Sequence, residues 1–147
     1  MKNNPKISVI MSAYNCEDSI EKAILSIINQ TYQDWELLIV DDASTDNTNL
    51  ILKDFSKKNN KIKFYKNLSK EGLAYNLNRL IKVSNGTFIA RMDADDISMP
   101  KRLEKQIKFL EKNKEIEVLG TAAKIIFQGK SKTTYPIMNH QDILKKI

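Results

Sequence analysis

The sequence predicts an α/β fold in which helices flank a mostly parallel sheet. Short apolar runs alternate with longer segments whose apolar residues recur every three or four positions, which is typical of buried strands joined by amphipathic helices. This alternation favours parallel pairing, because each helix carries the chain back across the sheet. The 147 residues, 41% of them hydrophobic, can bury one core, and we expect a single domain over residues 1–147.

Periodicity defines the first three elements. Residues 7–11, Ile-Ser-Val-Ile-Met, form a short apolar run and predict a buried strand. Residues 19–30 carry isoleucines and an alanine at three- and four-residue spacing along one side of a predicted helix. Residues 35–40, Trp-Glu-Leu-Leu-Ile-Val, predict a second buried strand that runs into Asp41 and Asp42.

The alternation continues through the middle of the chain. Residues 44–47, Ser-Thr-Asp-Asn, supply capping side chains for a helix that ends near Lys58. Residues 62–65 predict a third strand. Residues 72–83 predict a helix with four apolar residues facing inward, namely Leu73, Leu77, Leu80 and Ile81.

The last third of the chain is less regular. Residues 85–86, Asn-Gly, form a turn before a fourth apolar run at residues 87–92, which predicts a buried strand. Residues 100–113 begin with a proline, which suits the first turn of a helix. One or two further strands are expected within residues 117–127, and residues 142–147 predict the start of another helix.

Charge and composition exclude several classes of function. The net charge is +6, with a pI near 9.3. A basic chain favours nucleic acid, phosphorylated ligands or an anionic membrane face, but lysines on solvated helix faces give the same charge. No basic cluster is interleaved with aromatic residues, so we expect no nucleic-acid partner. His140 is the only histidine, which argues against zinc chemistry and a Ser-His-Asp triad.

The sequence also bears on the cellular compartment. No apolar run approaches the length of a membrane span, and the N-terminus lacks a signal-peptide pattern. The single cysteine, Cys16, has no partner for an internal disulfide, which agrees with a reducing compartment. We therefore expect a cytoplasmic protein and leave open a peripheral contact with the inner membrane face.

Polar clusters follow three of the predicted strands, at residues 12–15, 41–42 and 93–95. Because ligands of open α/β sheets lie beyond the carboxyl ends of the strands, these clusters predict one site on a shared rim. Asp93 and Asp95 are the most informative pair, since two carboxylates so close together repel each other unless a cation lies between them. Such ligands suit Mg²⁺ or Mn²⁺, which also bind substrate phosphates. The alternative is an acidic turn that caps the next helix.

The other two clusters offer groups for a nucleoside. Ser12 and Ala13 are small enough for a nucleobase to approach the backbone, and Tyr14 offers an aromatic face. A tight turn with the tyrosine packed on the rim explains this cluster equally well. Asp41 or Asp42 can accept a hydrogen bond from a base N–H or a ribose hydroxyl, with helix capping as the alternative.

Two further candidates carry backbone donors or positive charge. Gly72 lies in the segment 70–74, Lys-Glu-Gly-Leu-Ala, where the N–H groups of a helix start could face a diphosphate. A plain helix start is the alternative. Arg91 is placed to balance the acid pair or to reach a phosphate, and an ion pair with Asp93 or Asp96 is the structural alternative.

Other phosphate-handling classes fit the residues less well. A receiver domain needs an aspartate after the third strand, where residues 65–67 are Tyr-Lys-Asn. Aspartyl-phosphate hydrolases need threonine or valine in place of Asp96 and carry their motif on the first strand. Neither a P-loop nor a G-x-G-x-x-G motif is present. A nucleotidyltransferase would bring a glycine-rich first loop with a lysine or arginine, which residues 12–15 lack.

Five stretches of the chain form a recognisable set: residues 7–15, 26–32, 38–46, 88–96 and 99–106. In this order they resemble the N-terminal half of family-2 glycosyltransferases. Within that family, the resemblance is strongest to the bacterial enzymes that build capsular, O-antigen and lipooligosaccharide chains. It implies the GT-A fold, a Rossmann-like sheet flanked by helices and here expected to be incomplete. It also implies sugar transfer from a nucleotide diphosphate, with inversion at the anomeric carbon.

The resemblance implies roles for the residues that follow the first two strands. Ala13 and Tyr14 would line the base pocket. Asp42 would hydrogen-bond the uracil ring of a UDP-linked sugar, with Asp41 as its neighbour. The partners that the resemblance implies are therefore a nucleotide sugar, expected to be UDP-linked, and a glycan or lipid-linked acceptor, with no nucleic acid.

The resemblance also implies how the acid pair works. Asp93 would lie near the ribose and the metal, and Asp95 would ligate Mn²⁺ or Mg²⁺ bridging the diphosphate. Asp96 is a weaker candidate than Asp95 for a metal ligand. The metal would neutralise the charge that builds on the departing nucleoside diphosphate.

One catalytic group of the family has no match in this sequence. In family members the second half of the chain supplies the acceptor site and the aspartate or glutamate that deprotonates the acceptor hydroxyl. We expect this base beyond residue 147, so that the chain is either a truncated donor-binding fragment or a naturally short protein. The alternative function is a non-catalytic nucleotide-sugar-binding module.

Overall fold

A four-stranded parallel sheet forms the centre of the chain's first unit. The computed structural model describes residues 4–135 and divides the chain into two units, Met1–Lys105 and Gln106–Ile147. The sheet has the strand order β3-β2-β1-β4, and all of its pairs are parallel. Its strands are β1 (Ile7–Ala13), β2 (Trp35–Asp41), β3 (Ile62–Lys66) and β4 (Phe88–Arg91).

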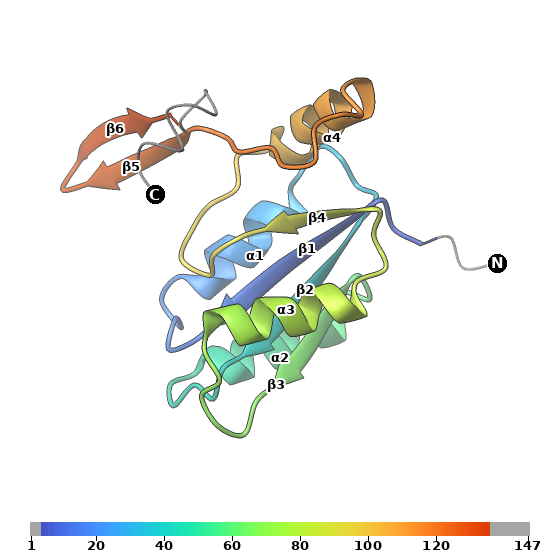
Figure 1. Ribbon diagram of the computed structural model, residues 1–147. Coiled ribbons are helices and arrows are strands. Elements are labelled where there is room, and N and C mark those ends of the chain that lie inside the picture. The colour runs from blue at the N-terminus through green and yellow to red at the C-terminus, as the bar shows by residue number, and fades with distance from the viewer. Residues whose placement is uncertain (1–3, 136–147) are drawn as a thin grey trace. The chain divides into compact units, whose positions relative to one another are not determined.

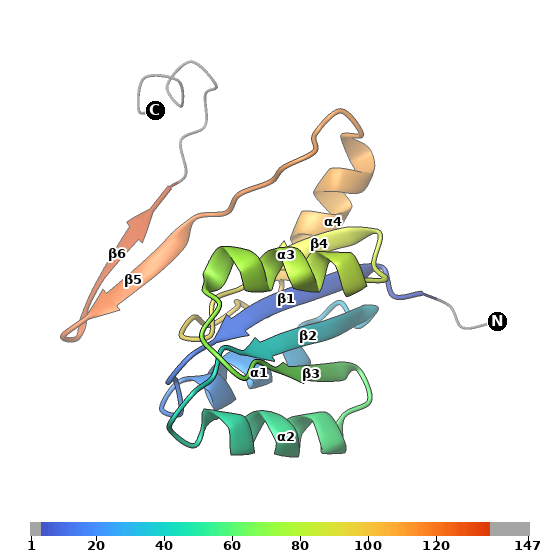
Figure 2. The ribbon, with the colours of Figure 1, turned by 60° about the horizontal axis from the view of Figure 1, so that its bottom comes forward.

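Helices cover both faces of this sheet. They are α1 (Ile20–Ile28), α2 (Thr48–Lys58) and α3 (Leu73–Val83), and α4 (Arg102–Lys112) follows them in the chain. The chain steps from β1 to β2 to β3 and then returns past β1 to β4, so right-handed crossovers place α3 on the face opposite to α1 and α2, as Figures 1 and 2 show. The strand order therefore reverses between β1 and β4, the position at which such sheets bind ligands.

The core lies on both sides of the two central strands. On the α3 side, Ile10, Leu38, Val40 and Leu80 form a buried cluster. Strand residues alternate between the two faces, so the intervening buried residues of β1 and β2 face α1 and α2; these are Val9, Met11, Leu37 and Ile39. Burial on both faces explains why the sequence of each central strand is a continuous apolar run.

The structure corrects two of the predicted burial patterns. In α3, Leu73 is 49% exposed and Ile81 is 47% exposed, whereas Asn76 is fully buried. The helix is rotated because Asn76 is drawn inward by hydrogen bonds to polar residues at the strand ends. In β4, Ile89 is 42% exposed, because this strand lies at the edge of the sheet rather than in its interior.

Two strands extend further than predicted. Ser12 pairs with Val40 and Ala13 with Asp41 in the ladder between β1 and β2, so Ser12, Ala13 and Asp41 belong to strands rather than to the loops that follow. Asp41 also pairs with Lys66 on β3. The continued parallel ladder on both sides of β2 is what carries these polar residues to the end of the sheet.

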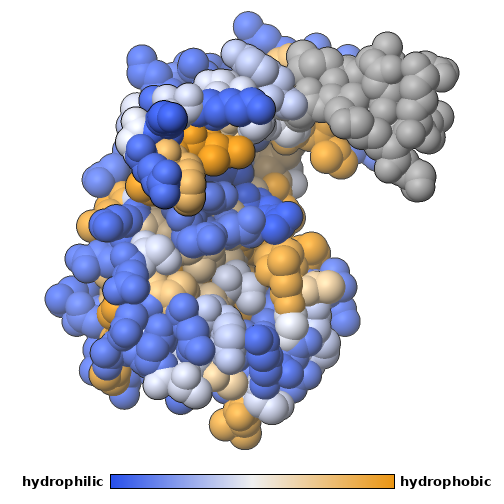
Figure 3. All heavy atoms as spheres, turned by 90° about the vertical axis from the view of Figure 1, so that its left-hand side faces the viewer, coloured by the Kyte–Doolittle hydropathy of each residue, from blue (hydrophilic) through white to orange (hydrophobic). Residues whose placement is uncertain are grey.

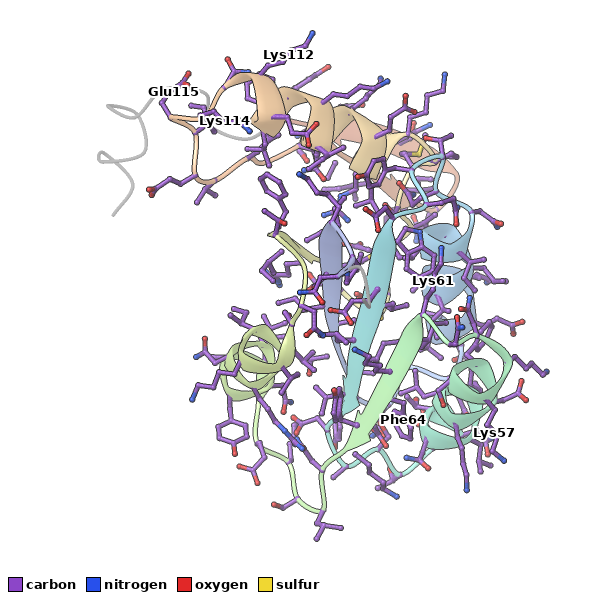
Figure 4. All side chains as sticks on the ribbon, turned by 90° about the vertical axis from the view of Figure 1, so that its right-hand side faces the viewer. Lys57, Lys61, Phe64, Lys112, Lys114 and Glu115 are labelled. Carbon is purple, nitrogen blue, oxygen red and sulfur yellow. The ribbon has the colours of Figure 1, made fainter. Side chains whose placement is uncertain are left out.

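Charged side chains contact Trp35 and Glu36 at the amino end of β2. The Nζ atom of Lys61 lies 4.8 Å from the ring centroid of Trp35, and Figure 4 labels Lys61 at the start of β3. Buried Glu36 accepts a hydrogen bond from Ser8 Oγ at 2.7 Å and forms an ion pair with Lys63, whose Nζ lies 2.6 Å from Glu36 Oε2. Burial raises the pKa of Glu36, but the bonds from Lys63 and other donors outweigh burial and lower it.

The described part of the second unit contains an antiparallel hairpin of β5 (Ala123–Phe127) and β6 (Lys130–Thr134). Its turn has positive φ at Gln128 and Gly129, 47° and 73°, as two-residue hairpin turns require. The sequence Lys-Ser-Lys-Thr-Thr of β6 has no apolar side, so this strand was not predicted. The helix expected at residues 142–147 lies outside the described residues. Within residues 4–135, no helix is long and apolar enough to cross a membrane.

Candidate functional site

A pocket of about 500 Å³ opens at the carboxyl ends of β1 and β4. Figure 3 looks toward this end of the sheet, and the surface of the sheet-bearing unit there is largely hydrophilic. The pocket is lined by Ser12, Tyr14, Asn15, Cys16, Asp18, Ser19, Asp42, Lys70, Gly72, Leu73, Arg91, Asp93, Ala94 and Asp95. Residues from all three polar clusters that were predicted to share one rim therefore line the same pocket.

Hydrogen bonds between two loops hold Asn15, one of the residues that line this pocket, in place. The backbone N–H of Asn15 donates to Ser44 Oγ at 3.0 Å, and the backbone N–H of Thr45 donates to Asn15 Oδ1 at 2.9 Å. The backbone N–H of Glu17 donates to Asp46 Oδ2 at 3.1 Å. Of the residues predicted to cap α2, Asn47 makes no side-chain capping bond, while Asp46 accepts the backbone N–H of Thr48. Ser44, Thr45 and Asp46 instead hold the loop after β1 in place.

The loop after β2 contains a strained residue. Ala43 has φ of 62°, which costs a residue with a Cβ roughly 1 kcal/mol. Ala43→Gly would relieve this strain, but the greater freedom of glycine in the unfolded chain offsets part of the gain. We therefore expect the free energy of unfolding to rise by less than about 1 kcal/mol. Urea denaturation would measure it. Ala74→Gly, in the exposed helical part of α3, should instead lower stability; a loss in both variants would contradict the strain argument.

Asp42 is the most enclosed carboxylate of the pocket, with 3% of its surface exposed. Its Oδ1 accepts hydrogen bonds from Asn67 Nδ2 at 2.9 Å and from the backbone N–H of Glu71 at 2.8 Å, and its Oδ2 accepts the backbone N–H of Gly72 at 2.9 Å. Burial raises the pKa of Asp42, but these bonds outweigh burial and lower the pKa to about 2. The side chain is therefore a fixed anion at neutral pH.

The start of α3 binds an anion, but one that belongs to the protein. The backbone N–H groups of Glu71 and Gly72 both donate to Asp42, so a diphosphate could bind them only by displacing this carboxylate, although Gly72 itself lines the pocket. Gly72 has φ of 89°, a conformation that glycine adopts without steric cost. This turn is what brings both N–H groups to one carboxylate.

A chain of buried amides extends from Asp42 and was not predicted. Asn67 Nδ2 also donates to Asn76 Oδ1 at 2.8 Å, and Asn76 Nδ2 donates to Ser12 Oγ at 3.1 Å. Arg79 Nη1 donates to Asn67 Oδ1 at 2.7 Å. The available signal in the sequence was Asn76 itself, a polar residue within the apolar stripe of a predicted helix.

Tyr14 and Lys70 form a cation–π pair at the pocket. The Nζ atom of Lys70 lies 3.6 Å from the centroid of the Tyr14 ring, close enough for an electrostatic attraction to the ring face. Tyr14 is 42% exposed, so its aromatic surface is accessible to a ligand. Lys70 begins the segment 70–74, which was selected for its backbone N–H groups, but its side chain was not among the predicted site residues because it is one of many lysines in residues 53–70.

Two predicted site residues do not line the pocket. Ala13 is fully buried. Asp41 is also fully buried, and its carboxylate accepts hydrogen bonds from the backbone N–H of Ser44 at 3.0 Å and from Asn49 Nδ2 at 2.9 Å. Because neighbouring side chains alternate at the end of a strand, Asp41 secures the loop before α2 while Asp42 faces the pocket.

The predicted acid pair lies where β4 ends. Arg91 Nη2 lies 2.8 Å from Oδ1 and 3.0 Å from Oδ2 of Asp93, which selects one of the two ion pairs considered from the sequence. Asp95 is exposed and lines the pocket. Asp96 lies outside the lining, and partial burial together with the charges of Asp95 and Asp93 raises its pKa.

The donor groups at this end of the sheet are consistent with a hard cation only if a ligand completes its coordination. Among residues 4–135, no group of three or more His, Cys, Asp or Glu side chains is arranged to hold a metal ion. Asp93 and Asp95 supply carboxylate oxygens, which Mg²⁺ and Mn²⁺ prefer. Such ions commonly bind one or two carboxylates and take their remaining ligands from substrate phosphates and water, so the residues present fit this type of ion.

Comparison with known proteins assigns the chain to a family. A family model described as Glycosyl transferase family 2 matches residues 8–145. The chain belongs to glycosyltransferase family 2. Among its curated relatives, the putative glycosyltransferase EpsE of Bacillus subtilis is 46% identical over 122 residues, covering 82% of this chain and 44% of that protein.

A second relative has a more specific description. WfgD of Escherichia coli, a UDP-Glc:alpha-D-GlcNAc-diphosphoundecaprenol beta-1,3-glucosyltransferase, is 42% identical over 107 residues, covering 73% of this chain and 42% of that protein. This family-2 chain thus spans less than half the length of either relative.

Solved structures share the fold of this family-2 chain. TarS 1-349 of S. aureus in complex with UDP-GlcNAc has a TM-score of 0.69 at 28% identity, covering 74% of this chain and 32% of that one. The mannosyltransferase PcManGT of Pyrobaculum calidifontis, in complex with GDP-Man and Mn²⁺, has a TM-score of 0.66 at 27% identity, covering 74% of this chain and 33% of that one. These likenesses confirm the predicted GT-A fold.

Proposed function

We propose that this chain is the donor-binding domain of a glycosyltransferase and binds a UDP-linked sugar together with Mn²⁺ or Mg²⁺. The observation that carries the proposal is that Tyr14, Asp42, Asp93 and Asp95 line one pocket at the point where the strand order reverses. UDP is favoured among nucleotides because WfgD uses UDP-Glc and TarS has been solved with UDP-GlcNAc.

The nucleoside end of the pocket supports this choice. Asp42 accepts hydrogen bonds from Asn67, Glu71 and Gly72, and a bond from the Asn76 side chain also lowers its pKa. Because a carboxylate has about four acceptor positions, Asp42 can take no more than one further N–H, such as that of uracil, and only by sharing or replacing the Asn76 donor. Lys70 Nζ covers one face of the partly exposed Tyr14 ring, so a base would pack against the rest of the ring or replace Lys70 there, and Ser12 borders the same space.

The diphosphate end is assigned to the charged residues after β4. Asp93 and Asp95 would hold the divalent ion, which supplies Lewis-acid stabilisation of the departing diphosphate when bound. Arg91 lies beside them and lines the pocket. Its ion pair with Asp93 is exposed, and an exposed pair contributes about 1 kcal/mol at most, so Arg91 can exchange this partner for a phosphate at little cost.

For the whole protein we propose inverting transfer to a glycan or lipid-linked acceptor during cell-surface polysaccharide biosynthesis. The reaction would take place in the cytoplasm, with peripheral contact at the inner membrane face. The general base that deprotonates the acceptor hydroxyl is assigned to the part of the relatives that this chain does not cover. In the full-length protein, a product that retains the configuration of the donor sugar would overturn the inverting mechanism.

Calorimetric titration with UDP tests the proposal directly. We expect tighter binding in Mn²⁺ than in EDTA, and we expect Asp95→Ala to lower the affinity in Mn²⁺ at least tenfold, because one of two protein ligands is lost. The control is Asp54→Ala, which removes an exposed carboxylate of α2 that pairs with Lys58. It should leave the affinity unchanged. UDP binding that is equally tight in both buffers, or in Asp95→Ala, would contradict the metal site, and tighter binding of GDP would contradict the choice of nucleotide.

A further inference from the structure

The side chain of Gln30 is buried beside α1 and has no part in the proposed chemistry. It is 2% exposed and makes hydrogen bonds in two directions. Its Nε2 donates to Met99 O at 2.9 Å, to Ser26 O at 3.0 Å and to Ser98 Oγ at 3.2 Å. Its Oε1 accepts the backbone N–H of Leu103 at 3.0 Å. One amide thus binds both the end of α1 and the segment that leads into α4.

Two serines of the same region hold other parts of that segment. Ser26 Oγ accepts the backbone N–H of Ser98 at 3.0 Å. Ser19 Oγ donates to Ala94 O at 3.1 Å, and Ala94 lies between the two proposed metal ligands. The segment 92–101 contains no helix or strand, so its backbone polar groups depend on side chains or water for partners.

We propose that Gln30 is a positioning residue that holds the segment after β4 in the conformation that binds the metal and diphosphate. This inference rests on the proposed function. Gln30 does not touch the pocket; it acts through Ser98 and Met99 on the loop that begins at Asp93. Metal ligands must be held within about 0.5 Å of their working geometry, and a loop that is ordered only on binding loses affinity to the entropy of ordering.

The position of these contacts distinguishes this role from general stabilisation. The wall that holds the nucleoside, made by Asp42 and the start of α3, receives no hydrogen bond from Gln30. Loss of the Gln30 amide should therefore weaken the metal-dependent part of UDP binding and spare the metal-independent part. A residue that only stabilised the fold would weaken both parts together or neither.

The test compares UDP affinity in Mn²⁺ and in EDTA for Gln30→Met, which keeps the length of the side chain and removes its hydrogen bonds. We expect at least tenfold weaker binding in Mn²⁺ and no change in EDTA. Hydrogen exchange should be faster at the backbone amides of Ser98 and Leu103. The matched control is Gln33→Met, since Gln33 is exposed and its side-chain amide bonds Ile28 O, Gln30 O and Lys61 Nζ but no atom of the segment after β4; this variant should behave as wild type in both buffers.

The outcomes are separable. If wild type itself shows no preference for Mn²⁺, the proposed function fails, whatever the variant does. If wild type shows the preference and Gln30→Met keeps it undiminished, or loses affinity equally in both buffers, the positioning role is overturned. Should Gln30→Met not fold, Ser26→Ala decides the matter, because it removes the bond from the Ser98 amide and should produce the same split at a smaller amplitude.

Discussion

Replacing Asp42 with asparagine should lower the free energy of unfolding by about 2 kcal/mol at pH 7. The carboxylate is buried, and the pKa of about 2 reflects hydrogen bonds that favour its charged form. Asparagine keeps one acceptor oxygen but turns an N–H₂ group toward donors such as the Gly72 amide, leaving a buried polar group unsatisfied. The change should appear as a lower urea midpoint with an unchanged slope.

The same pKa determines how this loss depends on pH. The folded pKa of Asp42 lies below its usual value of 3.8, so its contribution is fully present above pH ~4 and is lost as the pH falls through the folded value. The difference between wild type and Asp42→Asn should therefore narrow by about half at pH 3. Asp18→Asn is the control, an exposed pocket residue that should change stability by less than about 0.5 kcal/mol. A difference that stays constant from pH 7 to pH 3 would contradict the proposed charge on Asp42.

The location of the site could be predicted from the sequence because it follows from topology. Parallel strands end at one edge of the sheet, so acidic and aromatic residues after the first, second and fourth apolar runs had to come together. The pocket lined by Tyr14, Asp42 and Asp93 confirms that reasoning. The family resemblance pointed to the same fold, which the solved structures share.

Which residue of a pair faces the pocket could not be predicted in the same way. Side chains alternate along a strand, so an error of one residue in where the strand ends exchanges the two faces. The ladder of β2 runs through Asp41, which turns Asp41 to the loop before α2 and Asp42 to the pocket. Sequence alone could not decide between them.

The amides that support the site were beyond sequence reasoning for a different reason. Asn67 and Asn76 act through partners in three separate elements. Asn76 interrupts the apolar stripe of a predicted helix, but the sequence does not tell which residues it bonds, and Asn67 resembles an ordinary loop position. Gln30 lies in the stretch 26–32 that carries the family resemblance, yet its contacts with Ser98 and Leu103 are visible only in the structure.

Substituting alanine for Gly86 should destabilise the fold by about 3 kcal/mol, at the upper end for an overpacked position. A Cβ at this residue would lie 2.4 Å from the backbone nitrogen of Ser8 and 2.8 Å from the carbonyl carbon of Ile7. Both atoms belong to β1, which has a paired strand on each side and cannot move away. The Gly86 N–H also donates to Ser8 Oγ at 2.8 Å, a bond that the displaced turn would lose.

A displaced turn at Gly86 should also disturb the pocket, because this turn leads directly into β4. Among the strands of residues 4–135, β4 pairs only with β1, through Phe88 to Arg91, and Asp93 follows at its other end. Urea denaturation would measure the loss, with Thr87→Ala at the exposed neighbouring position as the control. Adding Ser8→Ala to Gly86→Ala should not restore stability, because the closest clash is with backbone rather than with the serine hydroxyl. If the double variant recovers the wild-type midpoint, the hydroxyl and not β1 itself limits the space at this turn.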